Sequence, residues 1–180
     1  SSKNPYGNFI WGMKELNVLI KKQRVFLEAN KEYHEGFKNG NTKIINYYGS
    51  KIAVIKSSNR MMANIAFSKK GFECDFVIVK NNKGHVIIQT KKELRGKRFD
   101  LSGVIFRLRL AEMRSNNVGN QNIDYSILSK EGSLIMCPEW YYHKDVECLI
   151  NGGTTHSQIK PSILDLTFIS KVITQAIGKK

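Results

Sequence analysis

The chain has 180 residues, a formal net charge of +14, a pI near 9.7 and a hydrophobic fraction of 41%. This apolar content and the presence of only 3 prolines exclude a disordered tail, and no apolar run approaches the ~20 residues that span a bilayer. The 3 cysteines, Cys74, Cys137 and Cys148, lack CxxC spacing, which argues against a disulfide framework and against structural zinc. We therefore expect a folded protein without a membrane partner in a reducing, intracellular and cytoplasmic setting.

The excess of basic residues has two explanations that composition leaves open. Lys and Arg number 29 against 15 Asp and Glu, which is typical of a domain that binds a polyanion such as nucleic acid. A Lys- and Asn-rich composition also arises in proteins from AT-rich genomes, where the lysines only solvate the surface. We expect a polyanion partner.

A long amphipathic helix is predicted at the N-terminus, from Phe9 to about Tyr33. Its apolar residues follow the spacing of one helical face: Phe9, Met13, Leu16, Ile20 and Leu27. Basic residues on its polar side suggest that it adds to a basic surface or links two domains. A Gly- and Asn-rich stretch, 36–41, predicts a loop after it. The chain then divides into an N-terminal helix and linker (1–40) and an α/β domain (41–180).

The next elements predict a βαβ unit followed by a hairpin. Strands are expected at Lys51–Ile55 and Cys74–Lys80, with a helix over Met61–Ala66 between them. This order makes the two strands parallel neighbours. The turn sequence 81–84 predicts that His85–Thr90 returns as an antiparallel partner.

The second half of the chain is predicted to contain two helices and short strands. Asp100 is expected to cap a basic helix, and a last helix is expected to start near Ser162. The basic residues of the first of these helices are Arg107, Arg109 and Arg114. Strands are expected at Ser133–Cys137, stopped by Pro138, and at Val146–Ile150. The expected fold class is α/β, with a mixed, mainly parallel sheet of about five strands flanked by helices and preceded by the long helix.

Several stretches in this order resemble one known family. They are Lys51–Ile55, Ala63–Ala66, Gly71–Val79, Val86–Lys91, Phe99–Ser102 and the late Gly152-Gly153 with His156. From about residue 45 to its end, the chain is similar to the DHH-associated C-terminal domain of the DHH phosphoesterase superfamily. In that family a strand, a helix, a strand and a hairpin precede a D-L/V-S helix start and a Gly-Gly-Gly-His motif. Here about forty residues separate that helix from the glycines, and the motif is Gly-Gly-Thr-Thr-His.

The resemblance implies a substrate-binding domain for the phosphates of RNA, single-stranded DNA or nucleotide phosphodiesters. The residues it implies for phosphate binding are Lys91, Lys92, Arg95, Arg98, Gly152, Gly153, Thr154, Thr155 and His156. Hydrolysis by Mn or Mg ions would belong to an N-terminal catalytic domain outside this chain, because no Asp-His-His word occurs here. We expect this chain alone to hold no metal or other cofactor and to be inactive, while the parent protein is a phosphoester hydrolase.

The glycine motif also predicts phosphate binding on physical grounds. Successive glycines after a strand let backbone N–H groups approach an anion closely. Thr154, Thr155 and His156 add hydrogen-bond donors. The alternative is that Gly152 and Gly153 only end a strand, and the residues alone leave both possibilities open.

A second interpretation is a metal-dependent nuclease of the PD-(D/E)xK type. In such nucleases an Asp at the start of one strand and a Glu-x-Lys or Gln-x-Lys on the next surround a magnesium ion and the scissile phosphate. Asp75, Gln89 and Lys91 match this pattern, because Gln89 and Lys91 are two residues apart on one predicted strand and share a face. Gln89 offers the metal a neutral oxygen only, and the Pro-Asp word is absent.

A third interpretation is a nucleic-acid-binding module without catalytic ancestry. Its basic cluster is Lys91, Lys92, Arg95, Lys97 and Arg98. Its candidate base-stacking residues are Phe99, Trp140, Tyr141 and Tyr142. For the aromatic residues, packing beside an apolar strand is the simpler expectation. His143, Asp145 and Glu147 have the alternate spacing of metal ligands on a strand, although a solvated edge strand explains them with fewer assumptions.

Overall fold

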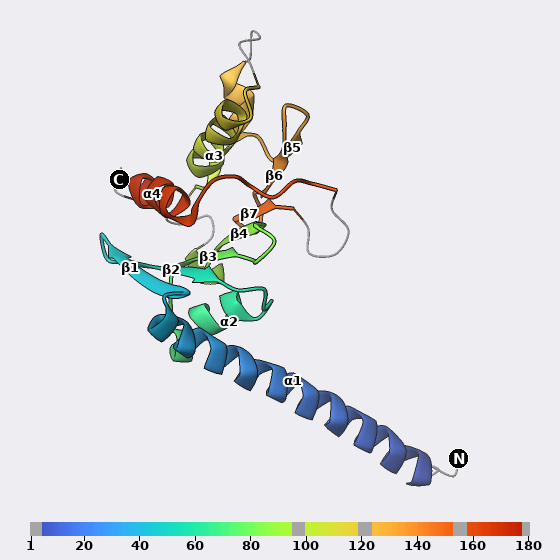
Figure 1. Ribbon diagram of the computed structural model, residues 1–180. Helices are drawn as coiled ribbons and strands as arrows, with labels where there is room; N and C mark the ends of the chain where they lie inside the picture. The colour runs from blue at the N-terminus through green and yellow to red at the C-terminus, as the bar shows by residue number, and fades with distance from the viewer. Residues whose placement is uncertain (1–4, 95–99, 119–123, 153–157, 178–180) are drawn as a thin grey trace.

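A computed structural model describes residues 5–94, 100–118, 124–152 and 158–177. Its helices are α1 (Pro5–Asn39), α2 (Met62–Phe67), α3 (Ser102–Ser115) and α4 (Leu166–Ile177), with short 3-10 helices η1 (Lys69–Gly71), η2 (Lys92–Leu94) and η3 (Tyr125–Ser129). Its strands are β1 (Thr42–Tyr47), β2 (Ser50–Lys56), β3 (Phe76–Lys80), β4 (Val86–Thr90), β5 (Gly132–Leu134), β6 (Cys137–His143) and β7 (Cys148–Asn151). Figure 1 shows α1 projecting away from the body that the other elements form.

The seven strands form one mixed sheet in the order β1-β2-β3-β4-β7-β6-β5. Within the described chain, β2 and β3 are parallel and the other neighbouring pairs are antiparallel. The predicted βαβ unit and hairpin are confirmed, because α2 connects the parallel strands β2 and β3 and β4 returns antiparallel to β3. The α/β class is therefore correct, but the expectation of a mainly parallel sheet of about five strands is wrong.

Two segments account for this difference. β1 pairs with β2 through a tight turn at Tyr48 and Gly49, whose φ angles of 46° and 74° match a type I′ hairpin. The residues between α3 and Gly152 form β5, β6 and β7, and β7 joins them to the first half by pairing with β4. Pro138 lies inside β6, where it precedes residues 140–143 that pair with β7. At that position the missing N–H of proline interrupts no β6–β7 pairing, so the strand continues past it.

Two apolar clusters pack on opposite faces of the sheet. On one face α3 and α4 cover residues of β2, β3, β4, β6 and β7, including Ile78, Ile88 and Leu149. On the other face, the end of α1 and α2 cover Ala53 and Val77. This second cluster contains no described residue of β4, β6 or β7. Half of that face therefore has no helix packed on it within the described chain.

Helix α1 contacts the body only through its C-terminal part. Tyr33 is buried and its hydroxyl donates to Gly71 O (3.1 Å), whereas each residue from Phe9 to Val25 is exposed. The helix is longer at both ends than the sequence predicted. Among the described helices, α1 included, there is none with enough length and apolar character to cross a membrane.

Two local predictions about the later helices need correction, and a third, Asp100 as the cap of α3, holds only in part because the N-cap residue is Leu101. The last helix begins at Leu166, because Asp165 Oδ1 accepts from Phe168 N (2.7 Å) at its start. Arg109 adds nothing to a basic surface, since it is fully buried. Its guanidinium donates to the backbone carbonyls of Leu128, Lys130, Gly132 and Trp140. Asp100 does precede α3, and its Oδ1 accepts from the backbone N of Ser102 (2.8 Å).

Candidate functional site

The predicted site residues that the structure describes lie at opposite ends of β4, each together with polar residues that the sequence did not single out. One end, which we call the glycine end, consists of Ser57, Asn59, Arg60, His85 and Gly152. The other, which we call the lysine end, consists of Lys51, Asp75, Lys91 and Lys92. β4 begins beside the end of β7 at the glycine end and leaves the sheet beside Asp75 at the lysine end. His85 and Lys91 are six positions apart, about 20 Å along a strand, so one phosphate cannot contact both.

The glycine end surrounds a small pocket of about 90 Å³. Its polar lining comes from Ser57, Ser58, Asn59, Arg60, Asn81, His85, Gln89 and Gly152, and its apolar lining from Ala63, Val79 and Ile87. One water molecule occupies about 30 Å³ of liquid water, so the pocket has about three times that volume. This is roughly the space that a phosphate group needs. The pocket lies where the parallel strands β2 and β3 end, the edge at which α/β sheets commonly bind ligands.

Gly152 and His85 are in direct contact in this pocket. Gly152 has a φ of +70°, and a Cβ there would lie 2.3 Å from His85 Nδ1. The position therefore needs glycine both for its left-handed backbone and for its closeness to the imidazole. His85 N donates to Asn81 Oδ1 (2.9 Å), which holds the turn, while His85 Nδ1 is buried with no hydrogen-bond partner in the described part of the chain. An unpaired buried ring nitrogen is a polar group that a ligand can satisfy.

The loop between β2 and α2 is held by hydrogen bonds that leave Arg60 exposed. Ser57 N donates to Lys80 O (3.1 Å), and Met61 N donates to Asn59 Oδ1 (3.0 Å). Asn59 Nδ2 also donates to Glu32 Oε2 of α1 (3.0 Å). The loop is thus fixed on both sides of Arg60, whose guanidinium is exposed beside the pocket.

Hydrogen bonds of two fully buried side chains, Asn151 and Glu112, hold the chain on both sides of residues 153–157, which lie outside the described residues. Before them, the fully buried Asn151 donates to Glu139 O (2.9 Å) and Lys160 O (3.2 Å). After them, the fully buried carboxyl group of Glu112 holds the chain that follows. This carboxyl group accepts from Ser162 Oγ (2.6 Å), Ile163 N (3.0 Å) and Trp140 Nε1 (3.0 Å). The glycine motif therefore starts from a fixed backbone position.

The lysine end brings Asp75, Gln89 and Lys91 onto one face of neighbouring strands. Lys91 N donates to Asp75 O (2.9 Å), and Asp75 Oδ2 accepts from Lys51 N (2.9 Å). Paired residues on adjacent strands point to the same face and side chains alternate along each strand, so the three side chains share a face. No group of three His, Cys, Asp or Glu side chains within the described ranges is arranged to hold a metal ion.

Two carboxyl groups near the lysine end have pKa values that are shifted in opposite directions. Burial raises the pKa of Glu147, whose Oε2 accepts from Leu101 N (3.1 Å). Partial burial acts to raise the pKa of Asp100, but hydrogen bonds from Ser102 outweigh it and hold that pKa below its usual value. Glu147 lies in the turn after β6 and not in a strand, so the strand-face spacing considered for His143, Asp145 and Glu147 does not exist.

The structure thus separates the described residues that were expected to bind phosphate. Gly152 lies at the glycine end, whereas Lys91 and Lys92 lie at the lysine end. Outside the described residues lie Arg95, Arg98, Gly153, Thr154, Thr155 and His156. Sequence reasoning missed Ser57, Asn59, Arg60 and His85, although polar residues directly after or before a predicted strand are a usable signal for a ligand-binding edge.

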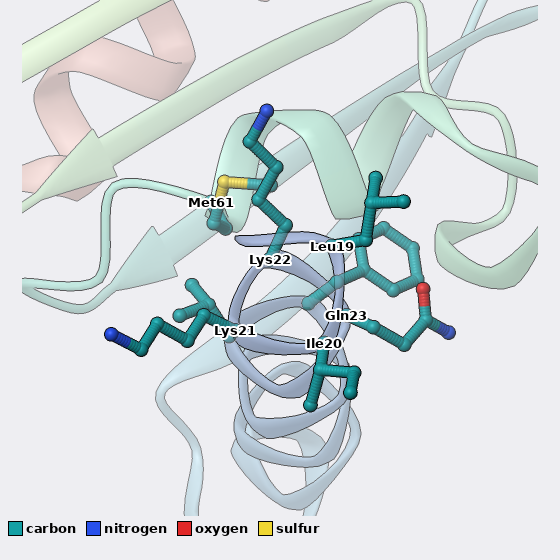
Figure 2. Close-up of a pocket in the computed structure, with 8 residues that line it drawn as sticks. Leu19, Ile20, Lys21, Lys22, Gln23 and Met61 are labelled. Carbon is teal, nitrogen blue, oxygen red and sulfur yellow. The ribbon is translucent and has the colours of Figure 1, made fainter. Parts of the chain in front are cut away.

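A larger apolar pocket of about 840 Å³ lies along α1 (Figure 2). Figure 2 shows Lys22 and Leu19 on the side of α1 that faces Met61, with Ile20 on the other side. The lining of this pocket is mainly apolar and includes Val25 and Phe26, and the polar residues along it are Lys21, Lys22 and Gln23. Without converging polar groups, this pocket is a packing surface and not a site for chemistry.

Comparison with family models, with curated proteins and with solved structures finds no match for this chain.

Proposed function

We propose that this chain is the phosphate-binding, substrate-binding domain of a DHH-type phosphoesterase. The observation that carries the proposal is the pocket at the glycine end, where Gly152, His85 and Arg60 surround space for a phosphate group. The first glycine of the motif, an unpaired ring nitrogen and an exposed guanidinium are the donors that such a group needs. The order of strand, helix, strand, hairpin and Asp100-Leu101-Ser102 helix start supports the same family.

The substrate is a polyanion such as RNA, single-stranded DNA or a nucleotide phosphodiester. A phosphate at the glycine end leaves Lys91 and Lys92 about 20 Å away, where they contact a second phosphate of a longer substrate. The net charge of +14 favours association with any such molecule. A short substrate is then held by the glycine end alone.

The partner in this proposal is an N-terminal catalytic domain that supplies the Mn or Mg ions and the hydrolytic step. Helix α1 suits a connection to such a domain, because the residues from Phe9 to Val25 extend away from the body with their apolar side chains exposed (Figure 1). This chain's own part is to bind and orient the phosphates.

A binding titration tests the proposal. Purified chain should bind short oligonucleotides and inorganic polyphosphate in competition with each other, and Arg60→Ala and Gly152→Ala should weaken both. Absence of saturable binding of either anion at low salt would remove the proposal.

A metal-dependent nuclease is the second candidate, favoured by the common face of Asp75, Gln89 and Lys91. The donor set fits a magnesium ion only in part, since it offers one carboxylate and one amide, and Asp75 Oδ2 already accepts from Lys51 N. The two candidates differ in what this chain does alone with magnesium or manganese. The phosphoesterase proposal predicts no cleavage, whereas cleavage that is lost in both Asp75→Ala and Lys91→Ala would establish the nuclease.

A further inference from the structure

On the sheet face that carries α1 and α2, the half formed by β4, β7 and β6 has no helix packed on it within the described chain, and it presents a distinct set of side chains. Strand register places Ile87 of β4 beside Ile150 of β7, and Ile150 beside Tyr141 of β6. The next row along the strands contains the half-buried Gln89, the buried Cys148 and the exposed His143. Both rows face away from the cluster under α3 and α4, which contains the alternate residues of these strands. We call this surface the open face.

The two aromatic rings of the open face lie close together. Tyr141 is 36% exposed, whereas its neighbours Trp140 and Tyr142 are 0% and 1% exposed, so alternation along β6 turns one of three consecutive aromatic residues outward. The Tyr141 and His143 ring centroids are 4.4 Å apart with planes at 48°. The sequence predicted that these aromatic residues pack in the interior. This prediction is confirmed for Trp140 and Tyr142 and is wrong for Tyr141.

The open face is continuous with the pocket of the glycine end. Gly152 follows Ile150 by two positions, about 7 Å along the strand direction, and Ile87 and Gln89 line both the pocket and the open face. The two rows contain no acidic side chain, and one step beyond Gln89 on the same face Lys91 lies beside Asp75. Apolar and aromatic surface beside a phosphate-sized pocket has the layout of a nucleotide-binding surface, with room for a base next to its phosphate.

We propose that the open face is a stacking platform for unpaired nucleobases. Tyr141 and His143 contact bases of single-stranded RNA or DNA, and the adjoining phosphate, whose placement rests on the proposed function, occupies the pocket of the glycine end. Sheet-borne aromatic side chains stack on bases without reading their sequence. The platform would make the domain prefer nucleic acid to an inorganic polyphosphate of equal charge, because polyphosphate has no base to stack.

The experiment compares two ligands by fluorescence anisotropy: labelled oligo-dT of five nucleotides, and unlabelled inorganic polyphosphate as its competitor. Tyr141→Ala should weaken oligo-dT binding about 5- to 150-fold, the range measured for losing one base–aromatic stack. Tyr141→Phe should retain nearly all affinity because it keeps the ring. The matched control is Tyr125→Ala, which removes another exposed tyrosine (51% exposed) on η3. The affinity for polyphosphate should be equal in all four proteins.

A second measurement needs no variant. An abasic oligonucleotide of the same length should bind the unaltered protein as weakly as oligo-dT binds Tyr141→Ala. Unchanged oligo-dT affinity in folded Tyr141→Ala, or equal affinity of abasic and normal strands, overturns the platform. If the unaltered protein does not bind polyphosphate while Tyr141→Ala still weakens oligo-dT binding, the platform stands and the proposed phosphate site fails.

Discussion

The two ends of β4 differ in how their side chains are held. At the glycine end, the backbone of Gly152 follows the buried Asn151, and the neighbouring loop is bonded on both sides of Arg60. At the lysine end, the exposed Lys51 donates from Nζ to Phe72 O (3.1 Å), and the exposed Lys92 lies on a short 3-10 helix. A fixed backbone can recognise the shape of a phosphate, whereas exposed lysines supply attraction that depends on salt. We therefore assign specific binding to the glycine end and general attraction to the lysine end.

The largest expected effect concerns the buried support of the glycine end. Glu112→Ala should lower the free energy of unfolding by about 3 kcal/mol or more, because it leaves two buried donors and one partly buried donor without their acceptor. Glu93→Ala, the same change at an exposed residue of η2, should alter it by less than about 0.5 kcal/mol. Urea denaturation measures both, and similar stability of the two variants would show that the glycine end is not held as described.

Substituting the glycine tests the close contact with His85. Gly152→Ala should weaken polyphosphate binding at least about tenfold, because the new Cβ displaces the imidazole. Gly49→Ala is the matched control, since its φ of +74° is similar but its Cβ would meet nothing within 4 Å. Both variants should lose about 1 kcal/mol of stability from the left-handed backbone. Equal affinities in the two folded variants would contradict a site at Gly152.

Removing one arginine at the glycine end and one on the exposed part of α1 separates specific binding from general electrostatic attraction. Arg60→Ala should lower the affinity for a short oligonucleotide about ten- to a hundredfold, the value of a hydrogen bond to a charged group. Arg24→Ala makes the same change on the exposed length of α1 and should have little effect. Calorimetric titration distinguishes the two, and equal losses would mean that only net charge matters.

Salt dependence sharpens the description of the lysine end. For a single strand long enough to reach both ends, the double variant Lys91→Ala, Lys92→Ala should reduce the log–log salt slope by about 1.4, or 0.7 per phosphate contact. For a nucleoside bisphosphate, which is too short to span about 20 Å, the affinity should not change. A loss of affinity for the short ligand would place the main contact at the lysine end instead.

The smallest expected effect is a pH dependence at Glu147. Its pKa is raised above 4.5 by burial, so the folded chain holds this proton more tightly than the unfolded chain. Stability from this group is therefore present below pH 4.5 and is lost as the pH rises through the folded-state pKa. Glu147→Gln should flatten the stability profile in that window relative to the unaltered chain, because it removes the titrating carboxyl group. Thermal melting between pH 4 and 7 measures the difference.

Local patterns in the sequence predicted local structure well. The βαβ unit, the hairpin and the Asp100 hydrogen bond at the start of α3 all depend on residues close in the chain, and the structure confirms them. The number of strands and their mainly parallel pairing were mispredicted, in part because β7 joins β4 through antiparallel pairing between segments about sixty residues apart. Burial of Arg109 and Glu112 also has no local signal, since their hydrogen-bond partners come from β5, β6 and the segment before α4.

Part of the candidate site was predictable and part was not. The sequence predicted a strand that stops at Pro138 and aromatic residues that pack, so it missed that alternation along β6 turns Tyr141 away from Trp140 and Tyr142. The sequence singled out Gly152. It did not show that His85 lies against this glycine, because that contact depends on the β4–β7 register.

An NMR titration of backbone amides shows directly whether a phosphate binds at the glycine end. With uridine 3′,5′-bisphosphate added to the ¹⁵N-labelled chain, the amides of Ser58, Arg60, His85 and Gly152 should shift in a saturable way. Those of Lys91 and Lys92 should remain nearly unmoved, because the ligand is too short to reach them. Shifts confined to the lysine end, or an absence of saturable shifts at Arg60 and Gly152, would contradict the account.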